Sequence, residues 1–261
     1  MNLVRKIMSI LEVIQQRHHA GKKSVAVLVD PDKVGDPSQL KHLIHLANEN
    51  CIDFFFVGGS LLTTSNLSEV ILTIKEDVNI PVILFPGSSL QIDPTADAIL
   101  FLSLISGRNP DLLIGQHVQA APILKSNNIE VLPTGYVLIN SGKTTSVAYI
   151  SNTTPIPEDK YSLAACTALA GEMLGLKLIY LDAGSGAERE ISSKMISAVR
   201  KAITVPLIVG GGINTPQKAL TALEAGADMI VIGNALEKNP DLLTEISDKV
   251  YDWNQRMETG G

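Results

Sequence analysis

Short apolar runs rich in β-branched residues alternate along the chain with stretches of helical periodicity. A run of about four to eight apolar residues that ends at a turn signal is typical of a strand buried on both faces. Eight such runs favour a (β/α)8 TIM barrel over an open doubly wound sheet, and no G-x-G-x-x-G sequence follows the first run. The predicted strands are Val25–Val29, Asp53–Val57, Val82–Phe85, Ala98–Leu104, Val131–Leu138, Leu178–Leu181, Pro206–Val209 and Met229–Ile232.

Polar residues followed by proline mark where several helices should begin, and two glycines mark helix ends. We expect a single domain that covers residues 1–261. The predicted starts are Asp36-Pro37, Asn109-Pro110, Thr215-Pro216 and Asn239-Pro240, and the predicted ends are Gly175 and Gly226.

An extra amphipathic helix is predicted over residues 2–18, before the first strand. A helix packed under or beside the barrel is favoured over one on a membrane surface, because its polar face has few of the Lys and Arg residues that a lipid-binding helix needs. Its apolar stripe consists of Leu3, Ile7, Met8, Leu11 and Ile14.

The segment between Phe85 and Ala98 has no helical periodicity and contains Pro86, Gly87 and Pro94. A crossover helix needs about ten residues or more, so the helix after the third strand should be missing and replaced by an irregular segment. The opening in the barrel wall would admit a long apolar molecule, or a neighbouring subunit would cover it. The residues leave both alternatives open.

The longest predicted loop, residues 140–157, is rich in Ser, Thr and Gly and follows the fifth strand. It therefore lies on the face of the barrel where the strands end. Loops of this length are usually functional lids or disordered segments.

Composition narrows the class of protein. A hydrophobic share of 45% suits a large core, and a net charge of −6 with a pI near 5.4 argues against a nucleic-acid-binding face. Cys51 and Cys166 fit small core residues of a reducing cytoplasm rather than a disulfide framework or a zinc site. No run is long enough to span a bilayer, and no signal-peptide pattern is present. Apolar helices without an obvious solvent face favour a homo-oligomer, a dimer or larger.

Glycines follow the last two predicted strands, in VPLIVGGG (Val205–Gly212) and MIVIGNA (Met229–Ala235). Glycines past a strand let backbone N–H groups turn towards an anion. Two such ends separated by one helix predict a phosphate site between them, and the segment after Gly233 has room for the short extra helix that binds phosphate in many barrels. For either stretch alone, glycines that merely turn a strand into a helix are an equal alternative.

The sixth strand ends in YLDAGSGAERE, which is the stretch richest in candidate chemistry. Tyr180 and Asp182 share one face of the strand, and Ser185 follows them at the barrel mouth. Gly184 and Gly186 free the backbone before a helix, which favours an anion contact. Asp182 is the best candidate for a general base, and a structural carboxylate that hydrogen-bonds substrate hydroxyls is the alternative.

Strand one ends in VLVDPDK, so Asp30 and Asp32 reach the same mouth, and Ser60 follows strand two. A carboxylate and a hydroxyl there suit Mg²⁺ shared with a diphosphate, although Asp30 alone would also fit a turn or a helix cap. We expect no lysine at a strand end, because Lys177 precedes its strand, and a Schiff-base aldolase is therefore disfavoured. The five histidines, His18, His19, His42, His45 and His117, fall in helical stretches and are expected on the surface.

Together these stretches resemble the geranylgeranylglyceryl phosphate synthase family, which includes bacterial heptaprenylglyceryl phosphate synthases. The resemblance covers almost the whole chain and rests on VDPDK, VGGS, YLDAGSGA, VGGGI and IGNA, in this order. It implies a prenyltransferase that joins the C3 hydroxyl of sn-glycerol 1-phosphate to an all-trans prenyl diphosphate, geranylgeranyl diphosphate being the expected donor, with release of pyrophosphate. A transient contact with a membrane surface is compatible with such substrates.

The resemblance also implies site residues. Asp30 and Ser60 match the Mg²⁺-binding positions of the family, and Asp182 and Tyr180 are the implied catalytic residues. Many members carry Glu where this chain has Asp182, one methylene shorter. The glycerol phosphate contacts are matched by Tyr180, Leu181, Asp182, Ala183, Gly184, Ser185, Gly186, Gly211, Gly212, Gly233 and Asn234.

Two other classes remain open on the residues alone. A phosphosugar isomerase or lyase would use the same phosphate site but would lack a long apolar groove. A non-catalytic barrel that binds phosphoglycerol or lipid would bind ligand without turnover.

Overall fold

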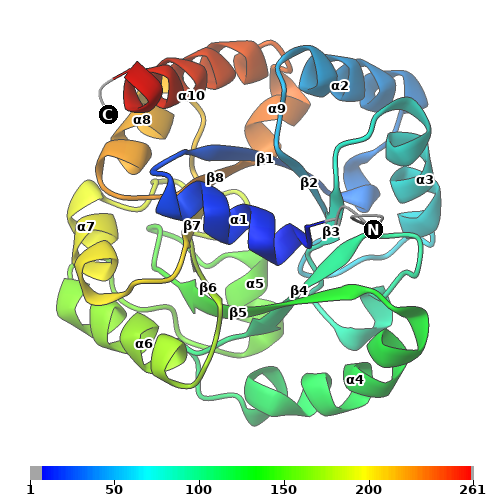
Figure 1. Ribbon diagram of the computed structural model, residues 1–261. Coiled ribbons are helices and arrows are strands. Elements are labelled where there is room, and N and C mark those ends of the chain that lie inside the picture. Colours follow the sequence, from blue (N-terminus) through cyan, green and yellow to red (C-terminus); the bar gives the residue numbers. More distant parts are fainter. Residues whose placement is uncertain (1–7, 260–261) are drawn as a thin grey trace, which may run out of the picture.

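The computed structural model describes residues 8–259 and closes eight parallel strands into a barrel, with β8 paired to β1 (Figure 1). The predicted TIM barrel is therefore confirmed, and all eight predicted strands form. The strands are β1 (Ser24–Val29), β2 (Phe54–Val57), β3 (Val82–Leu84), β4 (Ala98–Ser103), β5 (Glu130–Leu138), β6 (Leu178–Asp182), β7 (Leu207–Gly210) and β8 (Met229–Ile232).

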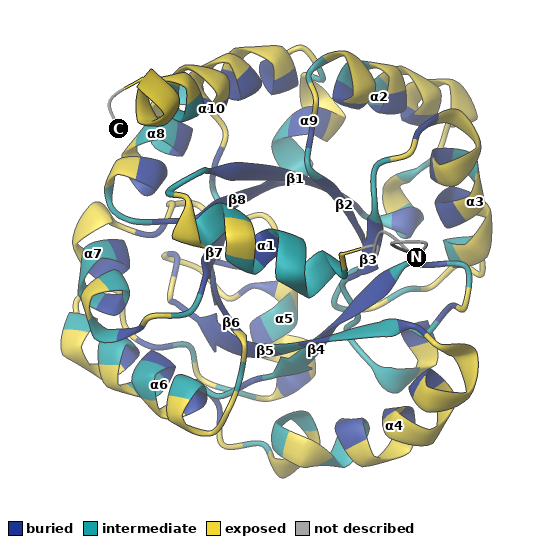
Figure 2. Ribbon diagram, viewed as in Figure 1, coloured by how far each residue is buried: buried dark blue, intermediate teal, exposed yellow. Residues whose placement is uncertain are grey.

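Helices surround the barrel and turn their outer faces to solvent, whereas the strands are largely buried, except that parts of β4 and β5 are only half-buried (Figure 2). Three short turns, η1 (Pro31–Lys33), η2 (Ser89–Gln91) and η3 (Asp111–Gly115), lie in connections at the carboxyl ends of strands. The helices are α1 (Ile10–His19), α2 (Pro37–Glu49), α3 (Leu67–Asp77), α4 (Gln116–Asn127), α5 (Ser146–Ser151), α6 (Tyr161–Met173), α7 (Ser193–Ala202), α8 (Pro216–Glu224), α9 (Asn234–Lys238) and α10 (Leu242–Thr259).

The connection from β3 to β4 contains only the three-residue turn η2. The predicted absence of a helix after the third strand is therefore confirmed. The predicted helix starts hold at Asp36 and Thr215, whose side chains accept hydrogen bonds from Ser38 N and Lys218 N. Helix α10 begins two residues beyond Pro240, after a turn in which Leu243 N donates to Pro240 O. Gly175 and Gly226 have positive φ angles of 95° and 117°, as expected for residues that end helices.

The barrel separates two apolar layers, because side chains alternate along each strand. One layer fills the barrel interior, and the other lies between the strands and the surrounding helices. Interior side chains include Phe54, Phe56, Leu100, Tyr136 and Tyr180, and all of these are buried. The inward row that reaches the carboxyl ends of the strands therefore faces the mouth of the barrel.

Helix α1 lies across the amino-terminal end of the barrel (Figure 1). Ile14 packs into the interior layer, and Glu130 at the start of β5 accepts hydrogen bonds from the amides of Ile10 and Leu11, both at 2.8 Å. The predicted helix under the barrel is thus present, but it begins at Ile10, where Ser9 caps it. Leu3 and Ile7 of the predicted stripe lie outside the described residues.

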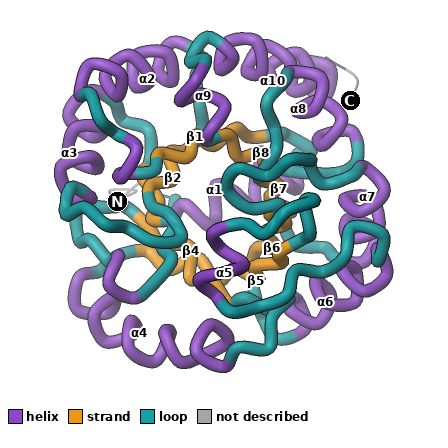
Figure 3. The backbone as a smooth tube through the Cα atoms, turned by 180° about the vertical axis from the view of Figure 1, so that it is seen from behind, coloured by secondary structure: helices purple, strands orange, loops and turns teal. Residues whose placement is uncertain are grey.

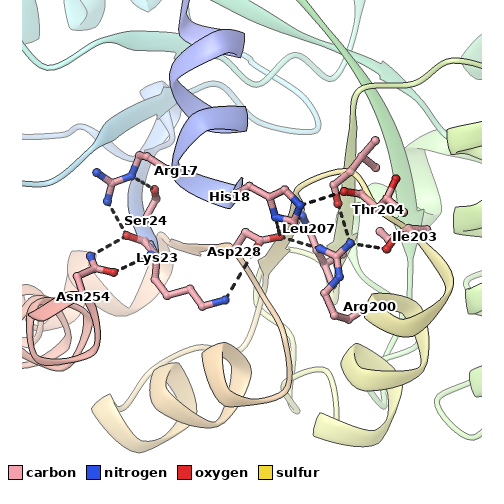
Figure 4. Close-up of polar contacts among 11 residues, drawn as sticks. Arg17, His18, Lys23, Ser24, Arg200, Ile203, Thr204, Leu207, Asp228 and Asn254 are labelled. Atoms are coloured by element: carbon pink, nitrogen blue, oxygen red, sulfur yellow. Dashed lines mark hydrogen bonds and ion pairs between the residues drawn. The ribbon is translucent and has the colours of Figure 1, made fainter. Parts of the chain in front are cut away.

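A buried charge cluster fastens α1 to the strands (Figure 4). Asp228, which precedes β8, accepts from Arg200 at 2.8 Å and from Leu207 N at 2.9 Å, and it lies 3.0 Å from His18 Nδ1. The expected surface position is therefore wrong for His18, because this carboxylate and the Thr204 carbonyl hold both ring nitrogens.

The core position predicted for both cysteines is also wrong. Cys51 lies in the turn after α2 and Cys166 on the outer face of α6, and both thiols are free and exposed. Apolar neighbours in the sequence do not bury a side chain that the helix turns outward. Within residues 8–259, none of the helices has the length and apolarity that crossing a membrane requires.

Replacing Asp228 by Asn should lower the free energy of unfolding by about 3 kcal/mol, because Arg200 and Lys23 would keep buried charges without their partner. Urea denaturation measures this. The control is Glu258→Gln, which breaks a half-exposed pair with Lys22 and should cost less than about 1 kcal/mol. Equal midpoints for the two variants would contradict a structural role for the cluster.

Candidate functional site

A single cavity of about 1420 Å³ occupies the carboxyl-terminal mouth of the barrel, where the sequence placed the candidate residues. It extends from the ends of β7 and β8 across the mouth to the outer side of β4. Figure 3 views this end, with α5 lying in front of the strands. Eleven of the predicted site residues line it, namely Asp30, Ser60, Tyr180, Asp182, Gly184, Ser185, Gly186, Gly211, Gly212, Gly233 and Asn234.

The turn after β7 has the backbone that the sequence predicts for an anion site. Gly211 and Gly212 have φ angles of 81° and 73°, a conformation that side chains disfavour. A Cβ at Gly211 would also lie 2.9 Å from the Ala183 amide nitrogen and from Asp182 Oδ1. The turn therefore requires both glycines, and the close approach of the β6 end adds a second requirement at Gly211.

Asn234 joins three loops at this end of the cavity. It begins α9, the predicted short helix after β8, and its amide nitrogen donates to Ser185 Oγ at 3.2 Å. Its Oδ1 accepts from Lys33 Nζ at 2.9 Å. The ends of β6, β8 and β1 are thereby tied around one space bordered by glycines, which suits a phosphate group.

Asp182 lies buried beside this space and is held at both oxygens. Its Oδ1 accepts from the Gly184 amide at 2.9 Å, and its Oδ2 accepts from the hydroxyl of Tyr136. Burial raises the pKa of the Asp182 carboxyl above its ordinary value, while these two hydrogen bonds act in the opposite direction. A carboxylate with a raised pKa, next to an anion site, has the properties of a general base.

Tyr180 lies deeper in the same wall, with its ring stacked on Phe85 at a centroid distance of 5.4 Å. A Cβ at Gly210 would be only 2.3 Å from the Tyr180 hydroxyl, so this glycine makes room for the phenol. Burial, followed by the nearby Asp182 charge, raises the pKa of Tyr180 well above its ordinary value. Tyr180 therefore remains protonated and able to donate a hydrogen bond.

Asp30 and Asp32 have different environments, although both follow β1. Asp30 faces the turn after β2, since a Cβ at Gly59 would be 3.4 Å from its Oδ1, and burial raises its pKa despite the opposing charge of Lys33. Asp32 accepts four hydrogen bonds, two from Thr63 and two from Thr64. These bonds, led by that from the Thr64 hydroxyl, lower the pKa of Asp32 to about 2. Asp32 thus holds two loops together, whereas Asp30 is the carboxylate open to a ligand.

Asp30 and Ser60 border the cavity on the β1–β2 side. In the part of the chain that the structure describes, no group of three or more His, Cys, Asp or Glu side chains is arranged to hold a metal ion. Any cation here would have Asp30 as its carboxylate ligand and would take further ligands from a substrate.

The apolar half of the cavity crosses β4. Leu100 and Leu102 belong to the interior layer, whereas Ile99 and Phe101 belong to the outer layer, yet all four line the cavity. Ile92, in the segment that replaces the missing helix, also lines it. The passage therefore leaves the barrel through the opening predicted from the sequence.

His117 is a residue of this passage that the sequence placed wrongly on the surface. Its exposed fraction is 9%, and its ring contacts Phe101 edge-on with centroids 4.5 Å apart. Burial lowers the pKa of His117, which favours the neutral form of the ring. The helical pattern around it did not reveal that α4 turns this position inward.

The predicted long loop 140–157 contains the short helix α5 and returns to the barrel where Ile156 pairs with Ile139. All residues from Lys143 to Ser151 except Ala148 line the cavity over the mouth. The position of the loop agrees with that expected of a lid, but the segment is folded rather than irregular.

The structure refines the predictions for several individual residues. Lys33 and Lys143 line the mouth, although no lysine was expected at a strand end, because both lie on loops several residues past β1 and β5. The side chains of Leu181 and Ala183 pack in the outer, helix-facing layer, so only their backbone could reach a ligand. Tyr136 was missed, because it lies within a strand and has no motif around it.

The PcrB family matches residues 17–250 of the chain. A protein of Spirosoma linguale named geranylgeranylglyceryl phosphate synthase is 56% identical over 95% of this chain and 99% of its own length. A protein of the same name from Chitinophaga pinensis is 52% identical over 90% of this chain and 93% of its own. The crystal structure of (S)-3-O-geranylgeranylglyceryl phosphate synthase from Thermoplasma acidophilum, in complex with substrate sn-glycerol-1-phosphate, superposes with a TM-score of 0.88 at 34% identity, covering 94% of this chain and 100% of the other.

Replacing Gly211 by Ala should weaken the binding of inorganic phosphate by about tenfold or more, because the added methyl group disturbs a turn whose amides would each donate a hydrogen bond to a charged oxygen. Isothermal calorimetry measures the affinity. Gly175→Ala is the matched control, since Gly175 also has a positive φ, of 95°, but lies outside the cavity. Equal phosphate affinity in the two variants would exclude the turn after β7 from the anion site.

Proposed function

The chain belongs to the PcrB family, and we infer that it is a prenyltransferase of the geranylgeranylglyceryl phosphate synthase type. It forms an ether between the C3 hydroxyl of sn-glycerol 1-phosphate and the first carbon of a prenyl diphosphate, and it releases pyrophosphate. The observation that carries this function is one continuous cavity in which an anion site, a buried carboxylate and an apolar passage follow one another.

We propose that the glycine turns and Asn234 hold the phosphate of glycerol 1-phosphate, and that the prenyl chain lies along Leu102, Phe101 and Ile92. The bond between the prenyl carbon and the diphosphate oxygen breaks, and its electron pair leaves with the diphosphate. The C3 oxygen forms the new bond to carbon, and its proton passes to Asp182. Tyr136 and the Gly184 amide orient the carboxylate for this transfer, and Tyr180 donates a hydrogen bond to the acceptor.

Mg²⁺ is the proposed cofactor, with Asp30 and Ser60 as its protein ligands. Mg²⁺ in such sites commonly takes one or two carboxylates and completes its shell with water and substrate phosphates, so a single open carboxylate beside a hydroxyl fits it. The charge of the ion would stabilise the negative charge that develops on the leaving diphosphate. Asp32 is not a ligand in this proposal, since threonine donors satisfy its oxygens.

The apolar passage favours this function over a phosphosugar isomerase or lyase, whose small substrates would leave it unused.

We also propose a homo-oligomer, and a transient membrane contact, through exposed apolar side chains beside the passage, including Leu90, Ile114 and Val118. Light scattering and vesicle flotation measure these two properties. A cytoplasmic location, which the two free thiols suit, belongs to the same proposal.

Purified protein incubated with sn-glycerol 1-phosphate, Mg²⁺ and a prenyl diphosphate should yield an ether product and pyrophosphate, with geranylgeranyl diphosphate as the expected donor. Farnesyl and heptaprenyl diphosphates, tested in parallel, define the preferred chain length. Chromatography of the dephosphorylated lipid detects the product. Binding of glycerol phosphate without a product from any donor would instead identify a non-catalytic barrel.

Asp182→Asn should lower kcat by at least about a hundredfold, because the amide cannot accept the proton. In the unchanged protein, activity should fall as the pH drops through the raised pKa of Asp182, at a higher pH than the ordinary aspartate value of about 3.9. Tyr136→Phe removes a hydrogen bond that favours the ionised carboxylate. The fall in activity on the acidic side of the pH profile should therefore move to still higher pH. Profiles of kcat/KM against pH test the shift. Near-normal turnover of the Asn variant would remove Asp182 from the role of base.

A further inference from the structure

Lys33 lies where the two anionic substrates would meet. Its Nζ is 3.6 Å from Asp30 Oδ2, on the side of the proposed metal, and 2.9 Å from Asn234 Oδ1, on the side of the phosphate site. A third contact, at 3.1 Å, is with Glu237 Oε1 in the first turn of α9. One ammonium group therefore spans the ends of β1 and β8.

The excess of carboxylates around the cavity makes the position of the Lys33 ammonium important for binding an anion. The ionisable residues that line the cavity in the described part of the chain include five carboxylates and three lysines, namely Asp30, Asp32, Asp111, Asp182 and Glu237 against Lys33, Lys143 and Lys238. An excess of carboxylates over cations opposes the binding of phosphate, and a cation within contact distance offsets this repulsion. Lys33 is the lysine for which the structure gives a contact with Asn234.

The contact between Lys33 and Glu237 can be exchanged for a contact with a phosphate oxygen. An ammonium group has three donors and no acceptor, so Lys33 can exchange one partner while it keeps the others. Glu237 has an exposed fraction of 36% and Lys33 one of 35%, and a pair so exposed to water contributes little stability. The partner most easily exchanged for a phosphate oxygen is therefore Glu237.

We propose that Lys33 is a substrate-binding residue that donates to the phosphate of sn-glycerol 1-phosphate, and that Glu237 holds its ammonium in place until the phosphate replaces the carboxylate. The assignment rests on the proposed function. Lys33 selects for the phosphorylated acceptor, while its proximity to Asp30 limits the repulsion between the acceptor phosphate and the diphosphate.

Substitutions at the two residues should act in opposite directions. Lys33→Met should weaken binding of sn-glycerol 1-phosphate by about tenfold or more, because a charge-assisted hydrogen bond is lost. Glu237→Gln should tighten binding, because a competing carboxylate is removed. Calorimetry on the metal-free protein measures both affinities, and the variants should unfold at the same temperature as the unchanged protein.

The pair at the opposite end of the barrel supplies matched controls. Lys22 and Glu258 form an exposed ion pair with a 2.7 Å separation, so Lys22→Met and Glu258→Gln change the net charge equally but away from the cavity. Neither should change the affinity. Equal effects of Lys22→Met and Lys33→Met would overturn the proposal in favour of a general charge effect.

Salt and kinetics separate binding from a structural role. Added KCl should weaken binding to the unchanged protein more than binding to Lys33→Met, and the variant should raise KM for glycerol 1-phosphate while kcat changes little. An unchanged affinity in Lys33→Met would overturn the inference and leave the proposed function intact. If the unchanged protein itself neither binds glycerol 1-phosphate nor forms the ether, the proposed function fails as well.

Discussion

Closure of the parallel sheet between β1 and β8 is the constraint on which the site depends. In this register Val27 lies opposite Ile232, which places the turn at Asp30 beside Gly233 and Asn234. On the other side, Asp182 lies opposite Gly210 and Leu138. Residues separated by more than two hundred positions therefore share hydrogen bonds, as Lys33 and Asn234 do. Strand register, rather than any single sequence motif, therefore positions the residues of the site.

The missing helix changes what this barrel can accept. The β3–β4 ladder has only two register pairs, and the connection between the two strands contains η2 in place of a helix. A complete ring of helices would close the mouth into a pocket for small substrates. Here the cavity continues over β4 into the outer layer, so an apolar chain can lie outside the barrel while its reactive end stays inside.

Features that depend on local sequence were predictable, and features that depend on distant partners were not. Eight strands, the missing helix and the glycine turns follow from periodicity and from the conformations that glycine allows. Asp30 and Asp32 looked equivalent, because the threonines that satisfy Asp32 lie about thirty residues further on. His117, Tyr136 and Lys33 were misplaced or missed for the same reason: only the packed structure shows what each side chain faces.

The aspartate at position 182 determines how the proposed base is held. A side chain one methylene shorter than glutamate stays closer to its own backbone, and the carboxylate is anchored there by the Gly184 amide two residues later. Both oxygens already accept a hydrogen bond, but a carboxylate has about four acceptor positions, so each oxygen keeps a lone pair for the substrate. The Asp182 side chain therefore reaches less far than a glutamate would, but its carboxylate is held more rigidly. The turn at Gly211 approaches Asp182 too closely to tolerate a Cβ, so in the proposed reaction an acceptor bound at this turn would lie next to the short carboxylate.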